Sequence, residues 1–165
     1  MTSFQLIGLP FESFASLFAL SDSELTALNA RRVVATESPG FPCRVSLMDA
    51  EIGEELLLLP FEHQPASSPY KASGPIFVRK AASQMSIEPG VIPDYVRRRL
   101  MSVRAYDSTH LICDAAVCDG ADTAAALRQM FANEKVAYVH LHNAKYGCFS
   151  CGVKKIQTDS DVVLP

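Results

Sequence analysis

The chain has 165 residues, of which 48% are hydrophobic and 20% charged, and its formal net charge is -3 at pH 7. This size and composition are typical of one globular domain with its own core, so we expect a single domain over residues 1–156 and a loosely held tail over residues 157–165. The negative charge argues against nucleic acid as a partner. No apolar run approaches the roughly 20 residues that span a bilayer, so we expect no membrane partner.

Strand and helix signals alternate in the first half of the chain. Strands are expected over residues 4–7, 33–35, 55–61 and 75–79. Ser21 and Glu24 form a capping box, which predicts a short helix over residues 22–29. Residues 62–74 are polar and interrupted by prolines. They therefore indicate a long irregular loop, and such loops are often functional.

The second half of the chain is patterned more regularly. Strands are expected over residues 101–106, 111–117, 137–142 and 148–156, and helices over residues 95–100 and 123–133. Most neighbouring strands are joined by turns rather than by helical crossovers. The sequence therefore predicts an α+β fold with one mixed, mainly antiparallel sheet and a few helices packed on one face.

The cysteines indicate a reducing environment. Five of them stand at positions 43, 113, 118, 148 and 151, an odd number that does not suggest a disulfide framework. No secretion signal is apparent at the N-terminus. We therefore predict a cytoplasmic protein with reduced thiols.

Three blocks of the sequence resemble a known family. They are residues 40–47 (GFPCRVSL), residues 73–77 (SGPIF) and residues 140–149 (HLHNA followed by GCF). The family comprises small bacterial proteins and is catalogued only as a domain of unknown function. The likeness extends from about Phe4 to Ile156. It implies a bacterial, cytoplasmic, single-domain protein, and it assigns no catalytic residue.

The last predicted hairpin concentrates the reactive side chains. If Leu141 pairs with Phe149, then His142 faces Cys148, and His140 lies on the same face of the sheet. A neighbouring imidazole lowers the pKa of a thiol and increases its thiolate fraction. Cys148 is therefore a candidate nucleophile, with His142 as its base.

Metal binding is an alternative chemistry for the same residues. His140 and His142 stand at positions i and i+2 of a strand, so both imidazoles can bind one ion. Cys148 or His63 can then complete a tetrahedral site, with zinc as the ion. In the nucleophile interpretation, His63 is instead a second base. Cys148 and Cys151 have C-x-x-C spacing, but in a strand they point to opposite faces, which argues against a redox pair.

Arginines in predicted strands suggest anion recognition. Arg44, Arg79 and Arg104 each lie in or beside a strand, where an arginine needs a partner. A guanidinium can hold a carboxylate or phosphate by two hydrogen bonds. The residues expected to contact such a ligand are Arg44, Tyr70, Ser73, Arg79, His140 and Asn143. In the alternative interpretation, the arginines only pair with nearby acidic residues or solubilise strand edges.

Together these patterns predict a protein that binds a small molecule, with an anion as the candidate ligand, in a polar cleft. The candidate catalytic residues in the cleft are Cys148, His142 and His63, and the reaction would be group transfer. No cofactor is required by the sequence. The competing interpretation is a non-catalytic binding or assembly module that forms a homodimer through the sheet.

Overall fold

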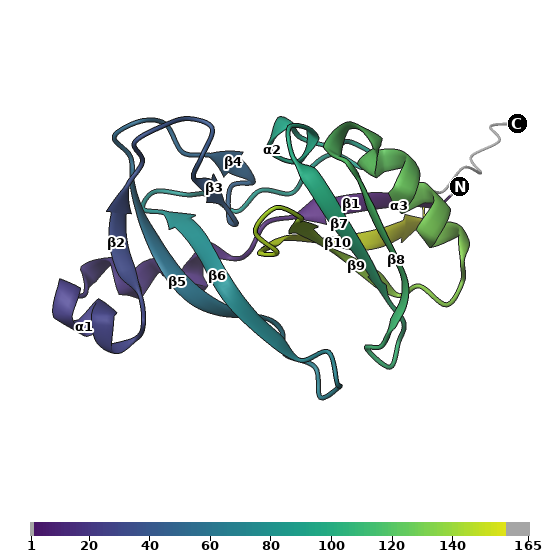
Figure 1. Cartoon of the computed structure of the whole chain (residues 1–165), viewed down its shortest axis with the longest axis horizontal. Helices are drawn as coiled ribbons and strands as arrows, with labels where there is room; N and C mark the ends of the chain where they lie inside the picture. Colours follow the sequence, from purple (N-terminus) through teal and green to yellow (C-terminus); the bar gives the residue numbers. More distant parts are fainter. Residues whose placement is uncertain (1, 158–165) are drawn as a thin grey trace, which may run out of the picture.

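Two five-stranded sheets form the protein, where the sequence predicts one. The computed structural model describes residues 2–157. Sheet A consists, in spatial order, of β1 (Thr2–Ile7), β10 (Phe149–Gln157), β9 (Tyr138–Asn143), β7 (Leu100–Tyr106) and β8 (Ile112–Asp119). Sheet B consists of β2 (Arg31–Val34), β5 (Glu55–Gln64), β6 (Ala72–Arg79), β3 (Pro42–Cys43) and β4 (Met48–Asp49). Figure 1 shows the two sheets side by side.

The predicted α+β class is confirmed, but the prediction of a single sheet was wrong. The chain begins in sheet A with β1, builds all of sheet B, and then returns to sheet A. As a result, β1 pairs antiparallel with the last strand, β10. Strand order along the sequence does not reveal this closure, because it depends on packing between segments that lie far apart in the chain.

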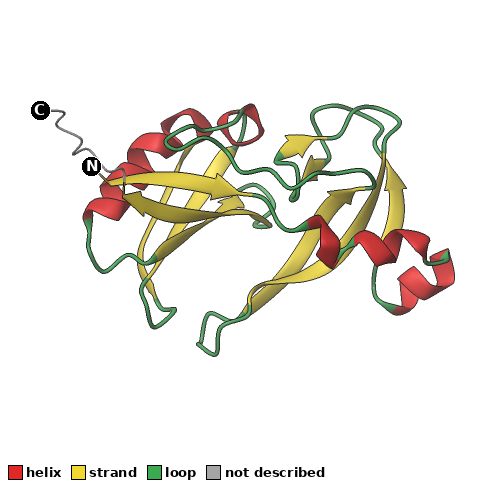
Figure 2. Ribbon diagram, turned by 180° about the vertical axis from the view of Figure 1, so that it is seen from behind, coloured by secondary structure: helices red, strands yellow, loops and turns green. Residues whose placement is uncertain are grey.

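The helices are short. They are α1 (Asp22–Ala27), α2 (Asp94–Arg97) and α3 (Thr123–Ala132), together with the 3-10 turns η1 (Phe11–Ser13), η2 (Ala15–Ala19) and η3 (Gly120–Asp122). Helices α3 and α1 lie on the outer flanks of the two sheets, and α2 lies near β4, where the sheets approach each other. Figure 2 shows α3 against sheet A and α1 beyond sheet B. The predicted capping box is confirmed, because the Ser21 side chain accepts from the Glu24 amide and the Glu24 carboxylate accepts from the Ser21 amide.

Sheet A has one apolar and one polar face. Val103, Val139 and Leu141 point to the apolar face and belong to a buried cluster that includes Leu127 and Phe131 of α3. Successive strand residues alternate between faces, so the residues between them face the other way. The polar face therefore carries Ser102, Arg104, Tyr106, Tyr138, His140 and His142.

Sheet B packs on the N-terminal helical segment. Its core contains Leu57, Ile76 and Val78 from the strands, together with Phe14 and Leu25. Each sheet thus has a core of its own, and the polar face of sheet A is left free to meet sheet B.

The loop predicted over residues 62–74 is shorter in the structure than expected. β5 continues to Gln64 and β6 begins at Ala72, so that only residues 65–71 connect the strands. Pro60 stands opposite Pro75 in this hairpin, where neither residue needs a backbone N–H for the ladder. His63 is therefore held on a strand and not in a flexible loop.

The β9–β10 hairpin is present, but its predicted register was wrong. His142 pairs with Phe149 and Leu141 pairs with Cys151, so that Ser150 is an extra residue on β10. Such a bulge turns the residues before it to the other face of the strand. Phe149 therefore points to the polar face, while Cys151 is buried in the core of sheet A.

Two further expectations concern the ends of elements. α2 ends at Arg97, and Leu100 already begins β7, so the predicted helix over residues 95–100 was too long. Gln157 belongs to β10, and the rest of the expected tail, residues 158–165, lies outside the described residues. Among residues 2–157, no helix is both long enough and apolar enough to cross a membrane.

Candidate functional site

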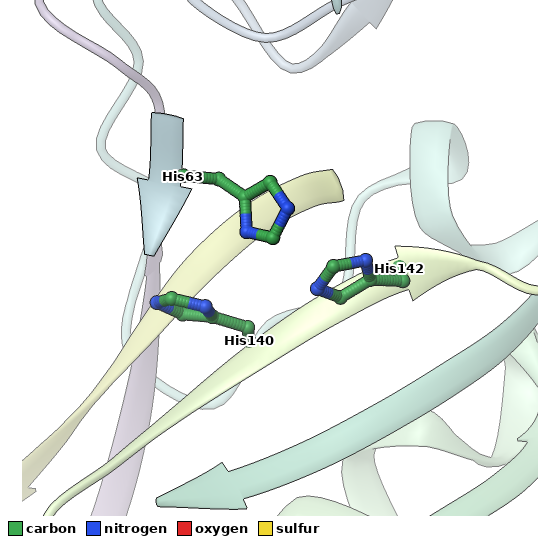
Figure 3. A group of neighbouring side chains, drawn as sticks. All are labelled: His63, His140 and His142. Carbon is green, nitrogen blue, oxygen red and sulfur yellow. The ribbon is translucent and has the colours of Figure 1, made fainter. Parts of the chain in front are cut away.

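Three of the four histidines gather where sheet A meets sheet B. His140 and His142 come from β9, and His63 comes from β5. One ring nitrogen of each lies within 4.8 Å of the others. Figure 3 shows the three rings around a common space. Three imidazoles arranged in this way can ligate one metal ion. We call these three residues the histidine cluster.

Each ring of the histidine cluster has one buried nitrogen that lacks a hydrogen-bond partner within residues 2–157. These atoms are Nδ1 of His63, Nδ1 of His140 and Nε2 of His142. A buried polar atom without a partner costs about 1–3 kcal/mol. A ligand that pairs with all three nitrogens would therefore stabilise the fold.

The turn after β9 orients the ring of His142. Its Nδ1 lies 3.1 Å from the carbonyl oxygen of Gly147. If Nδ1 donates to that carbonyl, the lone pair of the ring is on Nε2, which is the unpaired atom. Gly147 has a φ of 76°, a left-handed conformation that is strained for other residues. The turn thus presents a ligating nitrogen to the cluster.

Burial keeps the histidine cluster uncharged at neutral pH. Desolvation lowers the pKa of His140 to about 3 and that of His142 to about 4. Desolvation also lowers the pKa of His63, and the charge of Arg104 acts in the same direction. A neutral imidazole has the lone pair that metal coordination requires.

Phe149 forms a wall of the histidine cluster. Its ring stacks on that of His63, with centroids 5.3 Å apart and an interplanar angle of 3°. The same ring meets His140 edge-on at 5.2 Å and His142 edge-on at 5.8 Å. Phe149 reaches this position because of the bulge at Ser150, which turns it toward sheet B. The bulge therefore helps to build the site.

A group of tyrosines borders the cluster beside His140. Tyr106 lies 5.0 Å from the ring of His140 and stacks on Tyr138 at 5.1 Å. Tyr70, from the β5–β6 connection, meets Tyr106 at 6.3 Å. The buried Gln64 of β5 donates to the hydroxyl of Tyr138 at 2.9 Å. These contacts fix the end of β5 against sheet A.

Arg104 places a positive charge on the same face as the histidine cluster. It stands opposite His140 in the β7–β9 pair, and its charge lowers the pKa of all three histidines. Its Nε donates to Ser102 Oγ at 3.3 Å. No Asp or Glu within the described range forms an ion pair with it. The guanidinium therefore retains hydrogen-bond donors for a ligand.

A separate cavity of ≈ 670 Å³ opens between the two sheets. Its lining includes Phe41 and Phe77 from the side of sheet B, and Leu100, Asn143 and Cys148 from the side of sheet A. None of the three clustered histidines lines it. The cavity is therefore a second place where a ligand could bind, with a largely apolar wall.

Arg44 supplies the buried charge of this cavity. It lines the cavity and is only 2% exposed. Its Nε donates to the carbonyl oxygen of Phe149 at 2.8 Å, and its Nη1 donates to that of Pro42. Within residues 2–157 it has no carboxylate partner. A buried arginine without a counter-charge favours an anionic ligand.

The structure divides the site residues predicted from the sequence. His63, His140 and His142 form the cluster, and Arg44, Asn143 and Cys148 line the cavity. The other three predicted residues belong to neither place. Tyr70 contacts Tyr106, Ser73 is exposed, and Arg79 pairs with Glu54. Cys148 does not face His142, because Phe149 occupies that position in the register. The single cleft expected from the sequence is thus two separate places.

The sequence analysis did not predict Phe149 as a site residue. It noted Arg104 as a strand arginine but did not include it among the ligand-binding residues. Residues 102–106 alternate polar and apolar, which places Arg104 and Tyr106 on one face with Ser102. That pattern is the signal that could have assigned Arg104 to the site. Nothing in the sequence marks the bulge at Ser150, so the position of Phe149 could not be predicted.

The fold and the cluster define a two-sheet α+β protein with three histidines at the junction of its sheets. The family model described as protein of unknown function (DUF1203) matches residues 40–155, so the chain belongs to this family. The resemblance found in the sequence is confirmed, although the match begins at residue 40 and not near Phe4. No curated protein and no solved structure matches the chain.

Proposed function

We propose that the protein binds a divalent transition-metal ion, such as zinc, through His63, His140 and His142. The observation that carries this proposal is the convergence of three buried, unpartnered ring nitrogens from two sheets. Imidazole is a good ligand for zinc, copper, iron and nickel. Three protein ligands would leave one position of a tetrahedral ion open.

The proposal replaces Cys148 with His63 as the third ligand. Among residues 2–157, the three histidines form the one group of metal-ligating side chains at this spacing. The Cys148 thiol is directed to the carbonyl oxygen of Tyr146 at 3.7 Å and lines the cavity instead. The cluster thus supplies a complete set of three ligands without a thiolate.

The proposal is tested by titrating metal-free protein with Co²⁺ and Zn²⁺. Binding is measured by calorimetry and, for Co²⁺, by its visible absorption. We expect one ion per chain. His63→Phe keeps the stacking on Phe149 but removes the ligand, and should weaken binding by at least about 100-fold, since even the loss of an outer-shell partner costs 10–100-fold.

His110→Phe is the matched control, because His110 is the fourth histidine of the chain and is exposed. It should leave metal binding unchanged. Equal loss in the two variants, or no binding by the unaltered protein, would refute the proposal. Loss of binding in Cys148→Ser would restore the His140, His142 and Cys148 set expected from the sequence.

We infer a second candidate function at the cavity, namely binding of a small organic anion. The specific support is Arg44, which is buried at the cavity wall without a carboxylate partner in the described part of the chain. Phe41, Phe77 and Leu100 would contact an apolar body. Group transfer by Cys148 would take place here, because the thiol lines the same cavity.

Phenylacetate and its neutral isostere phenylacetamide test this second function. We expect phenylacetate to bind and to shift the amide resonances of Asn143 and Cys148 in a nuclear magnetic resonance titration. Phenylacetamide should bind at least about 10-fold more weakly, because a charged hydrogen bond is worth about 1.5–3 kcal/mol. Equal binding of the two compounds, or shifts confined to other regions, would contradict the assignment.

A further inference from the structure

We propose that the metal ion at the histidine cluster takes a small oxyanion as its fourth ligand, and that Arg104 binds the same anion. This inference rests on the proposed metal binding and specifies which chemical class occupies the open position. The anion would bridge the ion and the guanidinium. Carboxylate, carbonate and phosphate share the necessary chemistry, namely two or more oxygens on one centre that share its negative charge.

The charges around the cluster support an anion. A histidine that ligates a metal ion does so as a neutral imidazole, so the three ligands would leave the charge of a divalent ion uncompensated. Arg104 adds a further positive charge on the same face. Within residues 2–157, no Asp, Glu or Cys joins the group of ligating side chains. Uncompensated charge in a partly buried site is strongly unfavourable, and an oxyanion would neutralise part of it.

The geometry gives Arg104 the means to hold the anion. It stands opposite His140 in the β7–β9 pair, and residues that are directly opposite on one face have Cβ atoms about 4.5–5.5 Å apart. The bond from Nε to Ser102 Oγ turns the guanidinium along β7, toward the strand position that faces His142. Its Nη groups remain as donors, and arginine donors match the spacing of oxyanion oxygens.

The surroundings limit the size of the anion. Phe149 stacks on His63, and Tyr106 packs against His140. His142 is 1% exposed and His140 is 9% exposed. The cavity beside Arg44 does not include the cluster. A ligand at the open position must therefore fit between these rings, which favours an anion of a few heavy atoms.

Acetate and its neutral isostere acetamide provide the test on the full chain. Co²⁺ affinity is measured by calorimetry in HEPES alone, with acetate and with acetamide. We expect acetate to raise the affinity for Co²⁺ by about 5-fold or more, as is typical of coupled binding sites, and to change the visible absorption of the bound ion. Acetamide should do neither. By linkage, Co²⁺ should raise the affinity for acetate by the same factor.

Arg104→Gln separates this inference from the metal proposal. Without acetate, the variant should bind Co²⁺ more tightly than the unaltered protein, because a repelling charge is gone. With acetate, its gain in affinity should fall to less than about half of the gain in the unaltered protein, since the second anchor of the anion is lost. Arg31→Gln is the control, because Arg31 is an exposed arginine of β2 in sheet B; it should behave like the unaltered protein.

The outcomes distinguish the two proposals. Absence of Co²⁺ binding to the unaltered protein would remove both. Co²⁺ binding that acetate and acetamide affect equally would leave the metal site and overturn the oxyanion. A full acetate effect in Arg104→Gln would also overturn the inference, because another group would then hold the anion. If the variant fails to fold, the comparison of acetate with acetamide in the unaltered protein still shows whether an oxyanion binds together with the metal ion.

Discussion

At the scale of single residues, the two candidate sites contain two buried imidazoles, the half-buried imidazole of His63, and two arginines without acidic partners among the described residues. Arg79 shows the contrast, because its guanidinium contacts the carboxylate of Glu54. Arg44 and Arg104 have no such contact in the described part of the chain. In a protein with a net charge of -3, acidic residues are available for pairing. Their absence at both arginines is therefore a property of these sites and not of the composition.

We predict that metal-free protein loses stability in mild acid. In the unfolded chain, His140 and His142 take up protons near the ordinary pKa of 6.5, whereas in the folded chain burial lowers their pKa to about 3 and about 4. Between these values the unfolded state binds more protons. The free energy of unfolding should therefore fall as pH falls from about 6.5 to about 4, by up to about 1.4 kcal/mol per pH unit for each histidine.

Urea denaturation in the presence of a chelator, at several pH values across this window, measures the effect. His140→Phe should flatten the dependence of stability on pH, because it removes one of the groups that bind protons only when unfolded. A slope that is identical in His140→Phe and the unaltered protein would show that His140 is not the origin.

Much of the residue chemistry was visible in the sequence. The pattern His140-x-His142 on a strand identified two members of the cluster, and the isolated His63 was named as a partner. The predicted position of Cys148 opposite His142 was wrong, because it depended on the register of one hairpin, whereas a catalytic role of Cys148 stays a prediction. Which of several polar residues meet in space depends on such registers, and a one-residue shift reverses every side chain.

At the scale of elements, local signals predicted most strands and failed where pairing overrides them. The polar residues and the prolines Pro65 and Pro69 suggested an irregular loop over residues 62–74, since proline cannot donate to a ladder. The structure accommodates Pro60 and Pro75 by placing them opposite each other, beyond Leu58, where β2 stops pairing with β5. The resulting long hairpin carries His63 to sheet A, which a loose loop would not do reliably.

The bulge of β10 is a second feature that local sequence signals did not predict. Alternation of apolar and polar residues correctly predicted the strand and the turn, but periodicity cannot show an extra residue. The bulge lets Cys151 join the core of sheet A while Phe149 turns toward His63. Burial raises the pKa of the Cys151 thiol to about 12, so this half of the C-x-x-C pair is unreactive at neutral pH.

At the scale of the whole molecule, the two sheets meet mainly through polar and aromatic contacts, and Leu47 from the β3–β4 connection is the sheet B residue that joins the buried cluster of sheet A within residues 2–157. Sheet A has one buried cluster and sheet B another. Between them, Arg99 pairs with Asp49, Gln64 donates to Tyr138, and Arg44 donates to Phe149. A junction of this kind is specific in geometry, yet it buries less apolar surface than a continuous core would.

The predicted homodimer belongs to the same scale and stays a prediction. β8 is an outer strand of sheet A, and Val117 on it is 65% exposed. An exposed strand edge can pair with a second chain. This alternative differs from ligand binding in that it needs neither the histidine cluster nor the cavity.

The histidine cluster would join the two sheets when a metal ion is bound, because its ligands come from both. We therefore predict that Zn²⁺ stabilises the junction more than any other part of the protein. At a free Zn²⁺ concentration 100-fold above Kd, the unfolding free energy should rise by about 2.7 kcal/mol. Hydrogen exchange at the amides of residues 61–64 should slow most, since β5 holds the one ligand from sheet B.

The His63→Phe variant tests whether the metal ion links the two sheets or only binds to one of them. It leaves His140 and His142 on β9, so that any residual metal binding would involve sheet A alone. In that variant Zn²⁺ should no longer slow exchange in β5, although His110→Phe should retain the effect. If Zn²⁺ protected β9 and β5 equally in His63→Phe, the ion would not act across the junction. The sheets would then be held together by Phe149, Gln64 and Arg44 without help from a metal.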